Sequence, residues 1–376
     1  MLTVNAPPPV DRVTPLELFF DLVFVFTITQ LTAVLYHAPT LRSLAQVVLM
    51  LGVIWWMYGG YAWMTNAVSA HTANRRLLLL GGMAGYFVLA LAIPHAFSSS
   101  GLAFGIAYLV VVGVHTTLFT RSSTAGVVRA ILRLAPYNLG SALVILVGGA
   151  VGGAAQYVLW SLAVAFEWLT PVIRGNRGFD IAAAHFVERH GLVVIVAIGE
   201  SVVAIGIGAS HLAVDGALVV VALLGLALSA CLWWLYFGGD TERAERALRT
   251  MQPVRRARAA LNAFGYAHLP ILLGIITIAA AERAGFTHPS HSLAWSRSAL
   301  LGGGVAIFLA GDVLLRWELG IGRTTIRTGA ALLAVAALPL GAFVSPAAEI
   351  GALVLILVTA IGAEARLPAF EQGGAS

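Results

Sequence analysis

The chain has 376 residues, of which 59% are hydrophobic and only 10% are charged. A typical soluble domain carries about 25% charged residues, so a soluble protein of this size could not cover its surface with so few. The net charge of +5 comes from 22 basic residues, all of them arginine, against 17 acids. This composition excludes a soluble enzyme, a nucleic-acid-binding module and a disordered chain. It predicts an all-α integral membrane protein that crosses the bilayer several times.

A helix that spans a membrane needs about 20 consecutive, mostly apolar residues. Twelve stretches of the chain meet this requirement, and the fifth, sixth and twelfth are the weakest because they are short or closely spaced. The expected spans are residues 16–36, 44–64, 77–97, 102–120, 136–153, 155–173, 191–209, 217–237, 259–281, 298–319, 324–344 and 347–363.

The twelve spans divide into two sets of six. The first apolar run contains acidic residues and is not followed by a small-residue cleavage site, so we expect a membrane span there and not a cleavable signal peptide. The expected parts are a flexible N-terminal arm at 1–15, a first six-helix half at 16–173, a connector at 174–190, a second six-helix half at 191–363 and a tail at 364–376.

The arginines predict the orientation of the chain in the membrane. Cytoplasmic loops of membrane proteins carry an excess of basic residues. If the N-terminus is cytoplasmic, only three of the 22 arginines fall in external segments, namely Arg42, Arg283 and Arg297. We therefore expect both termini in the cytoplasm and membrane lipids as the surroundings of the protein.

Short patterns recur in the two halves. Residues Ile54–Tyr58 close the second span, and the similar Leu232–Tyr236 close the eighth. Gly85–Tyr86 in the third span match Gly265–Tyr266 in the ninth. The recurrence predicts two halves in parallel orientation, an arrangement that often places a substrate site at the midplane between them. The alternative is that paired tryptophan and tyrosine only mark the membrane interfaces.

Glu200 is the sharpest candidate for function. It lies near the middle of the seventh span, where an ionisable group costs about 2.5–3.5 kcal/mol. Small residues at helical spacing accompany it, and such a stripe lets a second helix approach closely. We expect Glu200 to handle protons or cations, or else to form a structural hydrogen bond between helices. The stripe consists of Ala197, Ser201, Ala204 and Gly208.

Further acids stand near the cytoplasmic ends of the first and seventh spans. Glu17 and Asp21 share one helical face, and Gln30 lies deeper in the same span. The two acids either hold a basic group or cation, or dock onto arginines of the loops. Glu188 opens the seventh span with His185 three residues before it, but this spacing is not a recognised metal motif. We therefore expect no metal site and no cofactor.

Two histidines and one ion pair complete the candidates. His115 in the fourth span and His268 in the ninth are either interhelical hydrogen-bond partners or members of a proton relay. Asp312 and Arg316 stand one helical turn apart in the tenth span and are expected to form a structural ion pair. The basic stretch 243–258 is expected to be an amphipathic loop that touches anionic lipid headgroups.

Two stretches resemble the signatures of a known family. Residues Thr14–Phe26, continuing to Gln30 and Leu31, resemble the opening signature of the bacterial low temperature requirement protein A (LtrA) family, and Phe186–Leu192 with Ile198–Ser201 resemble its second signature. The resemblance extends over almost the whole chain. It implies a multi-pass bacterial membrane protein associated with growth in the cold, but it implies no catalytic role. The residues that match the signatures are Glu17, Asp21, Glu188, Glu200 and, more weakly, Gln30.

These observations favour a secondary transporter or permease of the bacterial plasma membrane, with proton coupling as one mode. The alternative is a membrane-embedded enzyme or accessory protein that acts on lipid or cell-envelope precursors. We expect an unidentified small molecule or ion as substrate and no nucleic acid. The sequence is compatible with a monomer or a homo-oligomer. A cavity that reaches Glu200 would favour transport, and a lateral opening beside Glu17, Asp21, His185 and Glu188 would favour the enzyme. The candidates for the substrate or proton pathway are Glu200, Glu17, Asp21, Gln30, Glu188, His268 and His115.

Overall fold

The computed structural model describes residues 13–67, 72–121, 125–174, 181–210, 212–287 and 292–367. All regular elements in these ranges are helical. They are α1 (Pro15–His37), α2 (Leu41–Ala67), α3 (Ala73–Ala92), η1 (Ile93–His95), α4 (Gly101–Thr120), α5 (Ala125–Val151), α6 (Gly153–Arg174), α7 (Ala183–Ala209), α8 (Gly216–Phe237), α9 (Asp240–Thr250), α10 (Pro253–Ala260), η2 (Leu261–Tyr266), α11 (His268–Thr287), α12 (Trp295–Leu319), α13 (Thr325–Ala336), α14 (Leu338–Phe343) and α15 (Pro346–Arg366).

The predicted all-helical membrane fold is confirmed. Within the described ranges, 12 helical segments are long and apolar enough to cross a membrane, and each corresponds to one of the predicted spans. The three weakest predictions are among them, at Val128–Val151, Gly153–Ile173 and Pro346–Arg366. Apolar length alone was therefore a sufficient signal, because a bilayer leaves backbone polar groups no partner except those within the helix.

The helices differ from the expected boundaries at several places, among them the start of α5 at Ala125, where residue 136 was expected. Helix α7 begins at Ala183, inside the segment expected as a connector, because strong helix formers precede its buried polar residues. The basic stretch expected as a loop forms two short helices, α9 and α10. The eleventh span is divided into α13 and α14, with a proline at the start of α14. Residues 1–12 of the predicted arm, 175–180 of the connector and 368–376 of the tail lie outside the described residues.

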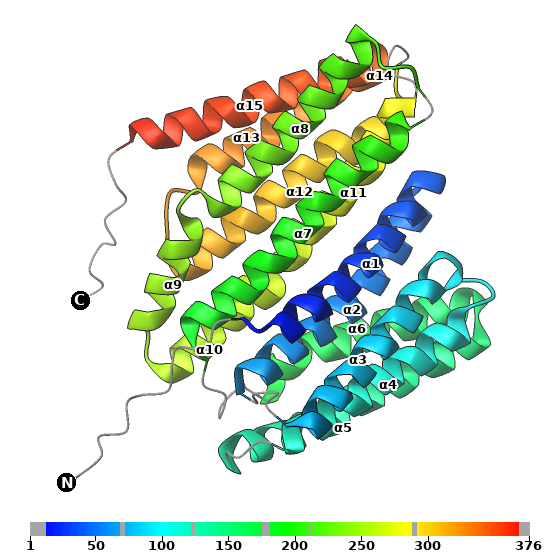
Figure 1. Cartoon of the computed structure of the whole chain (residues 1–376), viewed down its shortest axis with the longest axis vertical. Helices are drawn as coiled ribbons and strands as arrows, with labels where there is room; N and C mark the ends of the chain where they lie inside the picture. Colours follow the sequence, from blue (N-terminus) through cyan, green and yellow to red (C-terminus); the bar gives the residue numbers. More distant parts are fainter. Residues whose placement is uncertain are drawn as a thin grey trace.

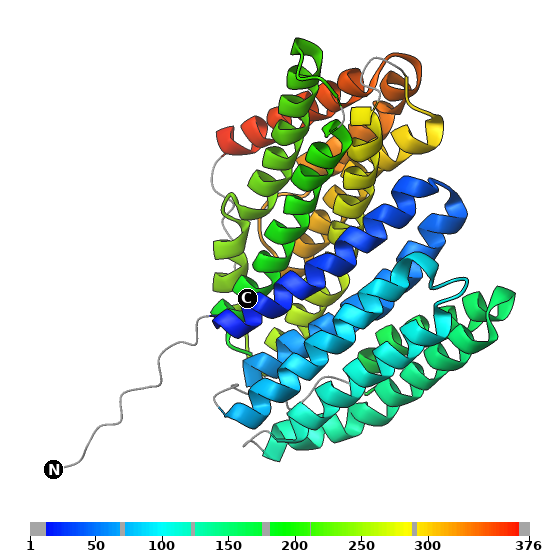
Figure 2. The same cartoon turned by 45° about the vertical axis from the view of Figure 1, so that its right-hand side comes forward.

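The helices form two bundles that meet along α1 (Figures 1 and 2). Helices α1–α6 make the first bundle, and α7–α15 make the second. Helix α1 packs against α7 and α11 of the second bundle, and α2 contacts α7, α11 and η2. The interface between the bundles is therefore built from the first two spans of one half and the first and third spans of the other.

Glycines allow the closest helix packing in the second bundle. A Cβ atom at Gly274 of α11 would lie 2.6 Å from the carbonyl oxygen of Gly304 in α12. A Cβ atom at Gly311 would lie 2.7 Å from the carbonyl oxygen of Ala267. Small residues at such contacts bring helix backbones together, which replaces the hydrophobic driving force that lipid surroundings do not supply.

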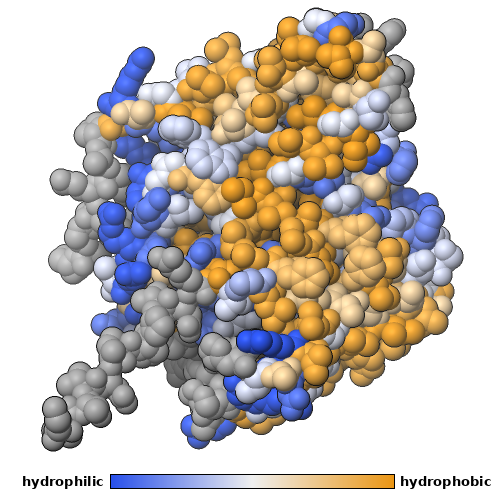
Figure 3. All heavy atoms as spheres, viewed as in Figure 1, coloured by the Kyte–Doolittle hydropathy of each residue, from blue (hydrophilic) through white to orange (hydrophobic). Residues whose placement is uncertain are grey.

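Apolar side chains cover much of the outer surface. In Figure 3 they form a broad field across the middle of the visible face, while polar side chains gather mainly toward the side where the chain ends lie. Large exposed side chains include Leu223 at 60% and Leu355 at 68% exposure. A soluble protein rarely exposes so large an apolar patch. The chain is therefore a multi-pass membrane protein, and this surface faces lipid.

The arginine distribution leads to a topology prediction. An even number of spans places the start of α1 and the end of α15 on one side of the membrane, which we call the terminal side. We expect reporter fusions between α2 and α3, between α4 and α5, and after Thr250 to report cytoplasm. Fusions between η1 and α4, between α7 and α8, and between α11 and α12 should report the outside. An external signal from the fusion after Thr250 would contradict this topology.

Candidate functional site

Two buried ion pairs join α1 to α7 across the bundle interface. The Oε1 atom of Glu17 lies 3.3 Å from Nε2 of His185, and Oδ1 of Asp21 lies 3.0 Å from Nη2 of Arg189. All four residues are at most 5% exposed. The acids expected to hold a basic group thus face a histidine and an arginine whose spacing matches their own. That shared spacing of one helical turn was the signal that could have identified Arg189, which the sequence prediction missed.

The beginning of α1 fixes the carboxylate of Glu17. Thr14 caps the helix, and its backbone N–H donates to Oε2 of Glu17 over 2.7 Å while its side chain accepts from the Glu17 backbone. This reciprocal capping box, with Pro15 in the first turn, is typical of a helix start. Because Oε2 serves the cap, Oε1 is left to face His185.

The second pair has an aromatic surround. The hydroxyl of Tyr58 donates to Oδ1 of Asp21 over 2.8 Å. The guanidinium of Arg189 lies 6.0 Å from the ring centre of Phe20 and 5.8 Å from that of Tyr58, a distance suited to cation–π attraction. Among the described residues, Oδ2 of Asp21 and Nε and Nη1 of Arg189 have no hydrogen-bond partner. The pair therefore has spare capacity for another polar group.

Aromatic and histidine rings continue from this pair toward α11. The rings of Trp55 and His268 are nearly parallel, with centres 6.1 Å apart, and His190 lies 5.5 Å from His268. A 2.7 Å hydrogen bond joins Nε2 of His268 to the hydroxyl of Tyr236. His268, predicted from sequence, is thus part of a buried ring stack between the bundles.

A π-helical turn, η2, shapes the second bundle beside this stack. Such turns leave backbone groups outside the regular helical pattern and often occur at functional sites. Here the carbonyl of Gly265 accepts a 2.8 Å hydrogen bond from Nε1 of Trp55. The hydroxyl of Tyr266 donates to the carbonyl of Trp168 over 2.7 Å. The turn therefore holds both α2 and α6 of the first bundle.

A cavity of about 100 Å³ lies between the two bundles at this turn. His115 is 2% exposed, and neither of its ring nitrogens has a hydrogen-bond partner among the described residues. The cavity lining extends to His190 of the ring stack but does not include Glu200, so this cavity does not meet the condition that was expected to favour transport. His115 contributes to the lining together with Trp55, Trp56, Trp63, Asn138, Trp168 and Tyr266.

Glu200 also joins α1 to α7, at a second level of the bundle interface. Its Oε2 atom accepts a 2.7 Å hydrogen bond from the hydroxyl of Thr29 on α1. The small residues around it are buried and face α11: a Cβ atom at Gly208 would lie 2.8 Å from the carbonyl oxygen of Arg283. The predicted close approach of another helix is therefore present, and that helix is α11.

Glu282 of α11 is an acid that the sequence analysis missed. It is 0% exposed, and neither carboxylate oxygen has a hydrogen-bond partner in the described part of the chain. It neighbours Ser201 of α7. The adjacent Arg283 places its guanidinium 4.2 Å from the ring centre of Tyr36 and attracts Glu200. The expected span ended at residue 281, immediately before these two residues.

Two predicted residues stand apart from these contacts. Glu188 lies on the exposed face of α7, while its neighbour Arg189 points into the interface. Gln30 is half-buried on α1, next to Thr29. The interface thus brings together Glu17, Asp21 and His268 at one level and holds Glu200 at another, with His115 at the edge of the cavity.

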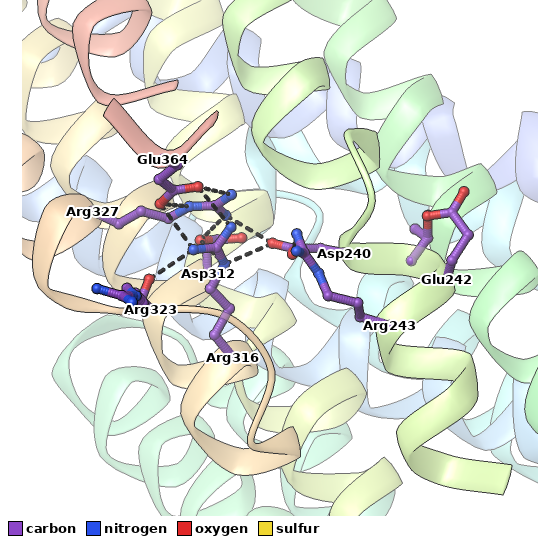
Figure 4. A network of polar contacts seen from close by, with 9 residues as sticks. Asp240, Glu242, Arg243, Asp312, Arg316, Arg323, Arg327 and Glu364 are labelled. Atoms are coloured by element: carbon purple, nitrogen blue, oxygen red, sulfur yellow. Dashed lines mark hydrogen bonds and ion pairs between the residues drawn. The ribbon is translucent and has the colours of Figure 1, made fainter. Parts of the chain in front are cut away.

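The predicted pair Asp312–Arg316 belongs to a larger network (Figure 4). Their side chains are 4.0 Å apart, but each has a closer partner. Arg327 contacts Asp312, and Nε of Arg316 donates to Asp240 over 2.7 Å. Both arginines also contact Glu364. The network fastens α9, α12, α13 and α15 together, and Asp240, Arg327 and Glu364 were missed because they lie at the edges of spans.

Twelve apolar spans and a charged interface between two bundles define a polytopic helical membrane protein. The family model for the bacterial low temperature requirement A protein (LtrA) matches residues 12–362, and the chain belongs to this family. It is 31% identical over 315 residues to an uncharacterized protein of Rhizobium meliloti (strain 1021), covering 80% of this chain and 76% of that protein. No solved structure matches the chain.

The Asp21–Arg189 pair gives a stability prediction. Replacing Arg189 by Gln leaves a buried carboxylate without its cation, which typically costs about 3–5 kcal/mol. We expect Arg189→Gln to lower the melting temperature of the purified protein in detergent. The double variant Asp21→Asn/Arg189→Gln removes both charges and should recover most of the loss, while Glu188→Gln on the exposed face should change little. Equal melting temperatures for Arg189→Gln and the parent would contradict this pairing.

Proposed function

We propose that this protein is a secondary transporter or permease of the bacterial plasma membrane, with its substrate path between the two bundles and coupling to protons through Glu200. The observation that carries the proposal is the position of the charges. One set of buried charged groups lies on α1, α7 and α11, where the two bundles meet, while another forms the network of α9, α12, α13 and α15. Ionisable groups inside a membrane protein usually mark a substrate, ion or proton path.

The packing order within each bundle supports two parallel halves. In the first, α1 contacts α2 and α3, α3 contacts α4, α4 contacts α5, and α2 and α5 contact α6. In the second, α7 contacts α8 and α11, α11 contacts α12, α12 contacts α13 and α14, and α8 and α13 contact α15. The order of these neighbours is the same, although α2 also contacts α4 and α12 also contacts α15. Alternating access in such proteins is largely a rocking of one repeat against the other.

The ion pairs between α1 and α7 are suited to hold the path closed on the terminal side. Glu17 and Asp21 are each joined to the opposite half through one basic partner. Rocking the halves apart would separate these charges, which is costly unless water or substrate replaces the partner. The unused hydrogen-bonding atoms of Asp21 and Arg189 provide the place for such a replacement.

In this proposal Glu200 couples transport to protons, and Glu282 is a second buried acid on the neighbouring helix α11. A carboxyl group in hydrocarbon persists only when it is neutral, paired or hydrated. Glu200 contacts Thr29 of the opposite half, so movement between the bundles changes its surroundings directly. It can therefore take up a proton in one arrangement and release it in another, with Arg283 as the nearby charge.

The aromatic cavity is the proposed substrate chamber. Ligand sites are commonly apolar clefts with a few polar groups that fix orientation. Here tryptophan side chains form the walls, and His115 and Asn138 supply the polar groups. This chemistry suits a small organic molecule with an apolar or aromatic face. A lipid-processing site is less well supported, since Glu17, Asp21 and His185 are buried away from lipid.

Replacing Glu200 tests the proposal. Glu200→Gln keeps shape and hydrogen bonding but cannot titrate, so we expect normal insertion and loss of activity. Activity is measured as rescue of growth in the cold in a deletion strain of the source bacterium, because the family is associated with that phenotype. Glu188→Gln, a matched change on the exposed face of the same helix, should rescue fully.

The opposite result would remove proton coupling from the proposal. That result is full rescue by Glu200→Gln together with failure of Glu200→Ala through low protein levels alone. Glu200 would then be a structural partner of Thr29, and the contact of 2.7 Å between their side chains would be its whole role.

A further inference from the structure

A second cavity, of about 250 Å³, lies on the terminal side of the second bundle. It is bounded by α8, α9, α12, α13 and α15, away from the bundle interface. Four arginines contribute to its lining, together with one acid, Glu364. The four are Arg243, Arg316, Arg323 and Arg327.

Two of these arginines are fully engaged by the network described above. Arg316 donates to Glu364 through Nη1 and Nη2, over 2.9 and 3.0 Å, and to Asp240 through Nε. Arg327 donates to Glu364 and contacts Asp312. Buried at 2–3% exposure, both are held by carboxylates on more than one helix and have a structural role.

The other two arginines have unused donors. Arg243 contacts Asp240 through Nη2, but its Nε has no hydrogen-bond partner among the described residues, and its side chain is 40% exposed. Within the described part of the chain, Arg323 takes part through its backbone carbonyl, which accepts from Arg316, while its side chain is exposed. They lie on two sides of the network (Figure 4). Three acids, Asp240, Asp312 and Glu364, face these four arginines and leave one positive charge in excess, while the exposed Glu242 in Figure 4 does not line the cavity.

The surroundings of the cavity are those of a membrane surface. Trp234 forms part of the wall and is 56% exposed, and apolar residues of α8 and α15 continue the wall. Tryptophan in a membrane protein typically lies at the level of the lipid headgroups. Basic pockets between spanning helices at this level bind anionic headgroups.

We propose that this cavity binds the phosphate headgroup of an anionic phospholipid, with Arg243 and Arg323 as its ligands. Arginine donors match phosphate oxygens in geometry and charge. The excess positive charge favours an anion, and the lipid-facing wall favours one that carries acyl chains. The bound lipid would link α9 to the turn before α13. The inference does not depend on the transport proposal.

Native mass spectrometry of the full chain tests this site. Protein is reconstituted in nanodiscs of phosphatidylcholine with or without phosphatidylglycerol, and the retained phosphatidylglycerol is measured. We expect the parent to retain it, and Arg243→Gln and Arg323→Gln each to weaken retention about five-fold, as expected for one arginine near a membrane surface. Arg246→Gln removes an exposed arginine of the same helix that does not line the cavity, so it is the matched control for general headgroup attraction and should weaken retention less than either of these variants.

Folding is controlled separately. Asp240 keeps Arg316 and Arg327 as partners when Arg243 is replaced, so the network should persist. If Arg243→Gln is not monodisperse, Arg323→Gln alone decides. Equal retention by a well-folded Arg323→Gln and Arg246→Gln would overturn the proposal. A rise in melting temperature with millimolar inorganic phosphate in pure phosphatidylcholine would also overturn it, because the site would then belong to free phosphate.

Discussion

The ion pair between Asp21 and Arg189 constrains the whole interface. A charge buried in a membrane protein is tolerated only with a partner, so α1 and α7 must lie side by side wherever both residues are ionised. Tyr58 of α2 then orients the carboxylate of Asp21. The rings of Phe20 and Tyr58 lie beside the guanidinium of Arg189. The contact of α1 with the second bundle, and with it the relative position of the two halves, depends on satisfying these few charges.

The protein uses buried charges in two different ways. In the network of the second bundle, Arg316 and Arg327 each contact several carboxylates, so the loss of one contact leaves others in place. At the bundle interface each acid has one basic partner, and hydrogen-bonding atoms stay unused. Redundant contacts make a rigid body, whereas single contacts can be exchanged. This contrast is what the proposed rocking of one bundle against the other requires.

The sequence predicts those features that depend on residues close together in the chain. The spans follow from runs of apolar residues, and the shared face of Glu17 and Asp21 follows from helical spacing, so both were predicted correctly. Arg189 and Glu282 were missed because their importance comes from helices far away in the sequence. Their positions at the ends of spans also resemble ordinary interfacial charges. The matching one-turn spacing of His185 and Arg189 shows that they can face Glu17 and Asp21, but only packing brings the two helices together.

An apolar layer separates the two polar levels of the interface. On α1, Phe24 and Ile28 are each 1% exposed and lie between Asp21 and Thr29, and the one buried polar side chain between them, Thr27, donates its hydroxyl to the carbonyl of Phe24. On α7, Val194 and Ala197 are equally buried between Arg189 and Glu200. A proton or ion cannot cross such a layer without water or a polar side chain to carry it. On the transport proposal, exchange between the two levels therefore takes place when one bundle is displaced against the other.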